Sequence, residues 1–203
     1  MYFQFFICAF IFMSRLIMNR LVVGVYLILI SYIGYYYNII GSVIITFAII
    51  GCFRELLSLT KSYLLSIIFG LIWFGPMIVT SIYFPSELII RASVLTSLFD
   101  MFQYIIGTNF GKFKYVLISP EKTVEGYIGG YILSMILSLI LEQNLCNMTI
   151  VYIMGICGDL FASWIKRVYY IKDFSNALGD HGGFIDRLDS ALFVIPLLNF
   201  INI

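Results

Sequence analysis

Charged residues are scarce in this chain. Only 11% of its 203 residues are Asp, Glu, Lys or Arg, whereas 62% are hydrophobic. Soluble domains carry about 25% charged residues, and the core of so short a chain could not bury that much apolar surface. The scarcity of charge therefore excludes an ordinary soluble domain. It predicts an all-α, polytopic integral membrane protein whose solvent is the lipid bilayer.

Cysteines are few, and the chain has almost no net charge. The four cysteines, Cys8, Cys52, Cys146 and Cys157, lie in or beside apolar segments, and no two form a CxxC pair. They are interpreted as small buried hydrophobic residues rather than as zinc ligands or a disulfide framework. The formal net charge is +1 without a basic stripe, so no nucleic-acid partner is expected.

Long apolar runs fill most of the chain. Because about 20 mostly apolar residues cross a bilayer, we expect roughly seven or eight transmembrane helices in one membrane domain, residues 1–203. The opening MYFQFFICAFIFMSR lacks a basic start and a cleavage site, which indicates a short first span rather than a signal peptide. The expected segments, the last of which could stop inside the bilayer, are 1–14, 20–37, 39–53, 62–81, 87–106, 126–142, 149–165 and 188–203.

Lys and Arg are unevenly distributed among the connections between these segments. Eleven of the twelve basic residues fall on one side, and Arg91 is the exception. The positive-inside rule assigns that side to the cytoplasm. The two polar loops, near 107–125 and 166–187, both lie there, so a site formed by them is expected to face the cytoplasm from the inner (plasma) membrane.

Two acids interrupt the apolar segments. Asp100 lies in TSLFDMFQYIIG and Asp159 in GICGDLFASWIKR, and charged side chains within spans are costly and usually functional. Counted along their helices at about 1.5 Å per residue, both lie roughly 10 Å below the cytoplasmic surface. The two acids could therefore share one cation. The alternative is a paired charge, Asp100 with Arg91 or Asp159 with Lys166.

The helix that carries Asp159 leads into the most polar stretch of the chain. Ser163 and Lys166 stack with Asp159 on one helical face. The stretch KDFSNALGDHGGFIDRLDS follows, with four aspartates, three glycines and the only histidine. Its glycine-rich backbone could wrap phosphate oxygens, and Asp186 and Asp189 offer oxygen ligands that suit Mg²⁺. The lone histidine could instead be a hydrogen-bonding scaffold.

The other polar loop reads GTNFGKFKYVLISPEKTVEGYIGG. GTNFGK departs from a Walker A loop in its spacer and in the residue after the lysine. In SPEKTVEG, Lys122 and Thr123 offer a cation and a hydroxyl, and Glu125 lies at the mouth of the next helix. A helix cap is the alternative role of Thr123. Gly126 and Gly130 indicate close helix packing.

Together these residues resemble a known family. The run from Ser163 to Asp189 resembles the C-terminal pattern of the phosphatidate cytidylyltransferases, which are integral membrane CDP-diacylglycerol synthases. SPEKTVEG resembles a second motif of the family, Asp100 with Tyr104 more loosely a third, and the resemblance extends from about Asn19 onward. The matching residues of the run are Ser163, Lys166, Arg167, Lys172, Asp173, Ser175, His181, Gly182, Gly183, Asp186, Arg187 and Asp189.

The resemblance implies a reaction and roles for these residues. CMP would pass from CTP to phosphatidic acid, giving CDP-diacylglycerol and pyrophosphate in phospholipid biosynthesis, in a homodimer that uses Mg²⁺ and a second cation such as K⁺. It implies that Asp159, Asp186 and Asp189 bind the metal, and the looser match adds Asp100. The implied catalytic residues are Asp159, Lys166, Asp186 and Asp189. The implied substrate-binding residues are Ser119, Lys122, Thr123, Glu125, Ser163, Arg167, Lys172, Asp173, His181, Gly182, Gly183 and Arg187.

Three other functions stay open from the sequence. One is a CTP-dependent kinase or cytidylyltransferase that acts on another membrane lipid, such as a polyprenol or an ether lipid. A second is a non-enzymatic ion transporter whose pathway uses Asp100 and Asp159, and a third is an inactive paralogue. The chain also departs from the family pattern, with Met101 and Phe102 where small residues are usual and Gly179-Asp180 where Pro-Gly is frequent.

Overall fold

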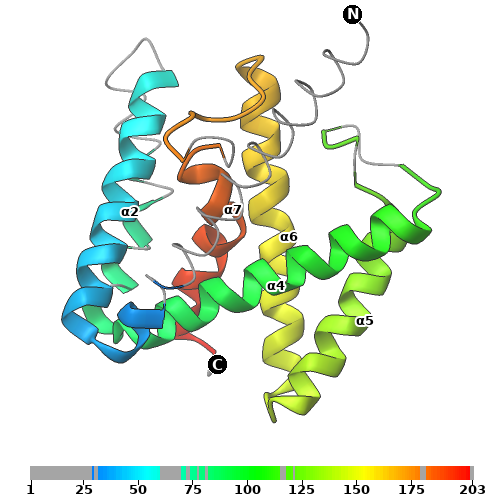
Figure 1. Cartoon of the computed structure of the whole chain (residues 1–203), viewed down its shortest axis with the longest axis horizontal. Coiled ribbons are helices and arrows are strands. Elements are labelled where there is room, and N and C mark those ends of the chain that lie inside the picture. The colour runs from blue at the N-terminus through cyan, green and yellow to red at the C-terminus, as the bar shows by residue number, and fades with distance from the viewer. Residues whose placement is uncertain are drawn as a thin grey trace, which may run out of the picture.

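The described part of the chain is helical. The computed structural model describes residues 29, 32–59, 70–71, 74–76, 78–80, 82–114, 118–120, 122–178 and 182–201, and no β-strand occurs in these ranges. The elements are α2 (Asn38–Leu59), α4 (Ser86–Phe110), α5 (Val124–Ile140), α6 (Leu145–Val168), α7 (Ile185–Val194) and the 3-10 helix η2 (Ile195–Asn199) (Figure 1).

Three of these helices, α2, α4 and α6, are long and apolar enough to cross a membrane. The apolar α5 is shorter, at 17 residues. Large apolar side chains cover the outside of the bundle; Ile50 of α2 and Leu139 of α5 are each 60% exposed, as suits contact with lipid. The predicted class, an all-α membrane protein, is confirmed. The expected number of spans stays a prediction, because segment 1–14 and most of 20–37 and 62–81 lie outside the described residues.

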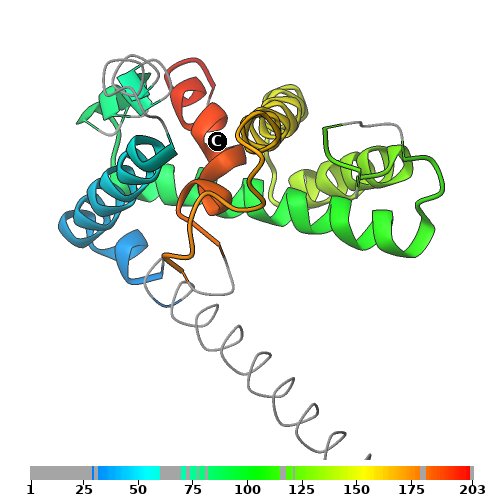
Figure 2. The ribbon, with the colours of Figure 1, turned by 90° about the horizontal axis from the view of Figure 1, so that it is seen from above.

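Helix α4 organises the bundle. It runs crosswise to α2 and α6, and α2, α7, α6 and α5 follow one another along its length (Figures 1 and 2). The core forms where these helices meet. The ring of Phe99 on α4 lies 5.8 Å from that of Tyr152 on α6, and Val151 and Leu192 are almost completely buried.

Glycines allow the helices to approach closely at two crossings. A Cβ atom on Gly130 of α5 would lie 2.7 Å from Gln103 Cγ of α4, and one on Gly126 would lie 2.8 Å from the Gln103 carbonyl. The GxxxG motif is therefore a packing motif, as predicted. At the other crossing, a Cβ on Gly158 of α6 would overlap the carbonyl oxygen of Asp189 on α7. Bulkier residues would push α7 and its acids away from α6.

The segment expected at 188–203 is not one continuous α-helix, which leaves the alternative given with it, that the last segment stops inside the bilayer. The α-helix α7 has ten residues and ends at Val194, where η2 begins. Pro196 lies at the start of η2, and it cannot donate the backbone hydrogen bond that an α-helix would need there. At about 1.5 Å per residue, α7 is too short to cross a bilayer.

The cysteines are only partly buried. Cys52 is completely buried, as predicted, whereas Cys146 and Cys157 are exposed on α6, and all three are free thiols. Cys8 lies outside the described residues. The prediction of burial was wrong for the two cysteines of α6, since lipid is as apolar as a protein core and a small apolar side chain can face either.

Candidate functional site

Acids from three helices gather around one ammonium group. Lys122, in the loop before α5, forms an ion pair with Asp159 of α6. Asp100 of α4 and Asp189 of α7 lie close enough to interact with the charge of Lys122. The Ser190 hydroxyl donates to Asp100 Oδ2 at 2.7 Å and so ties α7 to α4. We refer to Asp100, Lys122, Asp159 and Asp189 as the acid–lysine cluster.

The charge of Lys122 depends on these acids. Removal from water lowers the pKa of Lys122 below its usual value, and the positive charge of Lys166 acts in the same direction. The negative charges of Asp100 and Asp189 oppose this shift. The carboxylates of the cluster therefore stabilise the positive charge of Lys122, whose side chain is 24% exposed. The sequence alone did not show which carboxylates these are.

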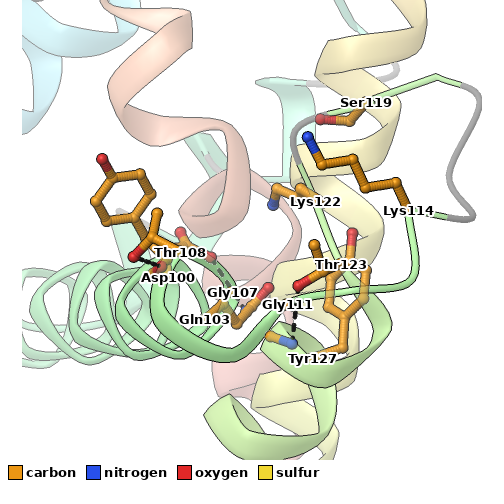
Figure 3. Close-up of a pocket in the computed structure, with 12 residues that line it drawn as sticks. Asp100, Gln103, Gly107, Thr108, Gly111, Lys114, Ser119, Lys122, Thr123 and Tyr127 are labelled. Carbon is orange, nitrogen blue, oxygen red and sulfur yellow. Dashed lines mark hydrogen bonds between the residues drawn. The ribbon is translucent and has the colours of Figure 1, made fainter.

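A cavity of about 510 Å³ adjoins the acid–lysine cluster. Its walls come from the C-terminal half of α4, the loop that follows α4 and the first turn of α5 (Figure 3). Asp100, Ser119, Lys122 and Thr123, all named from the sequence, line it. Small-molecule sites have volumes of about 300–1,000 Å³, so this cavity is large enough for part of a nucleotide or a lipid headgroup.

The loop that carries Lys122 is fastened at several points. The Thr123 hydroxyl accepts a hydrogen bond from the third backbone N–H of α5 at 3.1 Å, so Thr123 is the helix cap that was its alternative role. Both oxygens of Glu125 lie 3.2 Å from the backbone nitrogen of Phe113, which donates to them. Arg167 Nε donates to the carbonyl oxygen of Ile118 at 3.1 Å. These contacts hold the loop over the cavity and against α6.

Asp186, at the start of α7, pairs with Lys166 rather than with Lys122, and its neighbours use both of its oxygens. Lys166 Nζ donates to Oδ1 at 2.8 Å. The backbone N–H groups of Phe174 and Gly183 donate to Oδ2 at 2.8 and 3.0 Å. Asp186 thus fastens the loop between α6 and α7 to the end of α6. Asp159 and Asp186, expected to share one cation, are each paired with a lysine of their own.

The site has side chains of the kind that bind a metal ion, but in the part of the chain that the structure describes they are not arranged as a metal site. Within the described ranges no three His, Cys, Asp or Glu side chains are arranged to hold a metal. Carboxylate oxygens are nevertheless the ligands that Mg²⁺ takes, and Asp100, Asp159 and Asp189 already gather around the positive charge of Lys122. Asp186 fits less well, because its oxygens are engaged. Metal binding by Asp159, Asp186 and Asp189 stays a prediction.

The other predicted substrate-binding residues are more dispersed. Ser163 is buried, and its hydroxyl lies 3.5 Å from the carboxylate one turn earlier in α6, to which it donates. Lys172 and Asp173 are exposed where the loop leaves α6, and Arg187 is exposed on α7. His181 lies outside the described residues. The substrate-binding roles of Lys172, Asp173 and Arg187 stay predictions.

Glu55 of α2 was not predicted from the sequence. Its side chain is buried, with 5% of the residue exposed. It accepts hydrogen bonds from the Ser175 hydroxyl at 2.6 Å and from the backbone N–H groups of Phe184 and Ile185 at 2.8 and 3.0 Å. An acid within an apolar helix is the signal that revealed Asp159. It was missed here because the segment was expected to end at residue 53.

The fold and the site define a helical membrane protein with a partly buried, ion-paired site beside a cavity. Residues 2–203 match the model of the cytidylyltransferase family. Because this match covers nearly the whole sequence, the chain belongs to the cytidylyltransferase family.

Several curated relatives share part of this sequence. A phosphatidate cytidylyltransferase of Aquifex aeolicus (strain VF5) is 46% identical over 108 residues, which are 50% of this chain and 42% of that protein. Phosphatidate cytidylyltransferases of Staphylococcus haemolyticus (strain JCSC1435) and Staphylococcus aureus (strain COL) are 40% and 38% identical over 126 residues, 57% of this chain and 48% of theirs. The chain spans about half the length of the curated relatives it matches.

Proposed function

We propose that this protein transfers the cytidylyl group of CTP to phosphatidic acid and releases pyrophosphate. One observation carries the proposal: in a chain of the cytidylyltransferase family, the Lys122–Asp159 ion pair lies beside a cavity of about 510 Å³. The names of the relatives support phosphatidic acid as the acceptor.

The chemistry joins two anions. An oxygen of the phosphatidate phosphate attacks the α-phosphorus of CTP. The bond from that phosphorus to the bridging oxygen breaks, and pyrophosphate leaves with the electron pair. The attacking phosphate is already an anionic nucleophile, so the reaction needs positioning and charge neutralisation more than a general base. The site must therefore supply positive charge where the two phosphate groups meet.

The basic residues of the site supply this charge. Lys122 lines the cavity, and Lys166 and Arg167 lie at the end of α6; charge-assisted hydrogen bonds from these residues would hold phosphate oxygens. Mg²⁺, when bound, neutralises phosphate charge that develops in the reaction. Asp159 and Asp189 would hold the ion, with Asp186 as the further ligand that the family resemblance implies.

The setting of the site is also proposed. Eleven of the twelve basic residues fall on one predicted side, which supports a site that faces the cytoplasm from the inner membrane. The acyl chains of phosphatidic acid would then stay in lipid while CTP arrives from water. The family resemblance supports a homodimer, a second cation such as K⁺ and a single membrane domain. The mass of the purified protein in detergent tests the dimer.

The test uses the purified full-length chain in detergent with tritiated CTP and phosphatidic acid. We expect a labelled liponucleotide and one pyrophosphate per label transferred, and we expect EDTA to stop the reaction and excess Mg²⁺ to restore it. Polyprenol, polyprenyl phosphate and ether-lipid acceptors are assayed in parallel. Label on one of these lipids alone would contradict the acceptor, and turnover that is indifferent to EDTA would contradict the metal. No labelled lipid with any acceptor, together with ion flux in liposomes, would replace the proposal with transport.

A further inference from the structure

The loop between α6 and α7 is hydrogen-bonded to a carboxylate of α2, that of Glu55. The described part of this loop arches from the end of α6 toward α2 before α7 begins (Figure 1). Glu55 accepts hydrogen bonds from this loop. It does not line the cavity. We propose that Glu55 is a positioning residue of the site, which fixes the start of α7 and thereby the places of Asp186 and Asp189.

Burial gives the Glu55 carboxylate a strong preference for these contacts. The residue is 5% exposed and lies between the buried Cys52 and Leu56 along α2. A carboxylate in apolar surroundings is costly unless hydrogen bonds satisfy it. Ser175 and Phe184 donate to Oε1, and Ile185 donates to Oε2. All three donors are neutral groups from the loop and from α7, so Glu55 is satisfied only while these stay in place.

Glu55 also caps the N-terminus of α7. The first N–H groups of a helix need acceptors, which a Ser, Thr, Asp or Asn at the cap position usually provides. The cap position of α7 is Phe184, which makes no side-chain hydrogen bond to the helix. Glu55 accepts from the N–H groups of Phe184 and Ile185 instead. Its negative charge also suits the positive end of the helix dipole.

The loop leaves no room for a side chain at Gly183. A Cβ atom on Gly183 would lie 2.5 Å from Glu55 Oε2. Gly182 has φ of 79°, which side-chain-bearing residues rarely adopt. Asp186 fastens the same strip of backbone from the other side through the Gly183 N–H. Two carboxylates, one from α2 and one from α7, thus hold the end of the loop between them.

The position of Glu55 connects it to the acids of the site. Asp186 follows Ile185 directly, and Asp189 lies one helical turn further along α7. Asp189 interacts electrostatically with Asp100, Lys122 and Lys166. Releasing the start of α7 would therefore shift one acid that pairs with Lys166 and another that belongs to the acid–lysine cluster. Glu55 acts on the reaction through α7 and touches neither reactant.

The test compares Glu55→Gln with the wild-type protein. Glutamine preserves the shape of the side chain, but in either orientation its NH₂ group faces one of the two backbone N–H donors. We expect kcat to fall about 10- to 100-fold while the KM for CTP changes far less. We also expect faster amide exchange in peptides covering 172–190 and unchanged exchange in α4. Ser175→Ala, which removes one donor and leaves both backbone bonds, is expected to show smaller changes of the same kind.

The matched control is Glu87→Gln, an exposed acid in the first turn of α4, which should match the wild type in both measurements. Wild-type kcat in Glu55→Gln, or faster exchange without a loss of kcat, would overturn the inference. If Glu55→Gln does not insert in the membrane, Ser175→Ala decides by the same criteria. The kinetic arm rests on the proposed function; should the wild type transfer no cytidylyl group, the proposed function fails, while the exchange arm still tests whether Glu55 fixes α7.

Discussion

The two polar loops of this molecule are held in different ways. The loop before α5 is fastened mainly by its own helix, through Thr123 and Glu125. The loop before α7 is fastened by carboxylates on both sides, Glu55 of α2 and Asp186 of α7. Both loops are rich in glycine and charge, so their sequences look alike. The first loop also contacts α6, through Arg167 and Asp159, but only the second is held by a buried carboxylate from α2.

The two loops therefore have different roles: the first carries a charged residue of the site, and the second holds the helix that carries two of its acids. The first loop projects Lys122 to an acid of α6 and forms part of the cavity wall. The second loop supplies backbone N–H groups that donate hydrogen bonds to Asp186 and Glu55. We infer that the first loop makes contact with reactants, whereas the second orients α7. Substitutions in the two regions should therefore affect activity and local structure in different proportions.

The largest contrast is expected between Asp159→Asn and Asp186→Asn. Both should lower CTP turnover by on the order of 100-fold or more, because each removes a charge that pairs with a lysine of the site. Only Asp186→Asn should also speed amide exchange in residues 172–190, since Asp186 holds that backbone. Turnover and exchange are measured on the same purified, membrane-inserted variants.

The outcome of that experiment has two separate readings. Near-normal turnover in either variant would contradict its assigned role. Equal exchange in the two variants would break the distinction between the loops. A normal yield of inserted protein is the control for folding, because each substitution replaces a charged side chain by a neutral one of the same shape.

Much of the site could be predicted from the sequence. Asp159 was found because a charge within an apolar helix is costly and needs a reason, and the structure places it in the acid–lysine cluster. Lys122 and Thr123 were found from a short motif, and both line the cavity. The packing role of Gly126 and Gly130 followed from their spacing, because residues four apart lie on one helical face.

The rest depended on information that is not local in the sequence. Glu55 was hidden by a boundary: α2 continues to Leu59, so an acid assigned to a polar connection is in fact inside a helix. The depth of Asp100 was counted along its helix as if α4 stood parallel to α6, whereas α4 runs crosswise (Figure 1). The pairing of Asp159 with Lys122 and of Asp186 with Lys166 depends on how the helices cross, which the spacing of residues along the sequence does not show.

A smaller effect is expected from Lys122→Met. The substitution keeps much of the side chain's volume and removes one charge-assisted contact, which is worth about 1.5–3 kcal/mol, or roughly 10- to 100-fold in kcat/KM for CTP. Lys112→Met is the matched control, because Lys112 is exposed on the same loop and does not line the cavity. Initial rates at varied CTP measure both. Equal losses in the two variants would indicate that the loop contributes only its overall charge.

The smallest effect is expected at the two helix caps, and it sharpens the comparison between the regions. Thr123→Ala removes the cap of α5 beside the cavity, and Asn144→Ala removes the cap of α6. Each should lower the free energy of unfolding by about 1 kcal/mol, measured by thermal unfolding in detergent. Only Thr123→Ala should also lower kcat/KM for CTP, by a few-fold, because it loosens the loop that presents Lys122. A matching loss of activity in Asn144→Ala would mean that activity follows global stability, and the special place given to the first loop would then be lost.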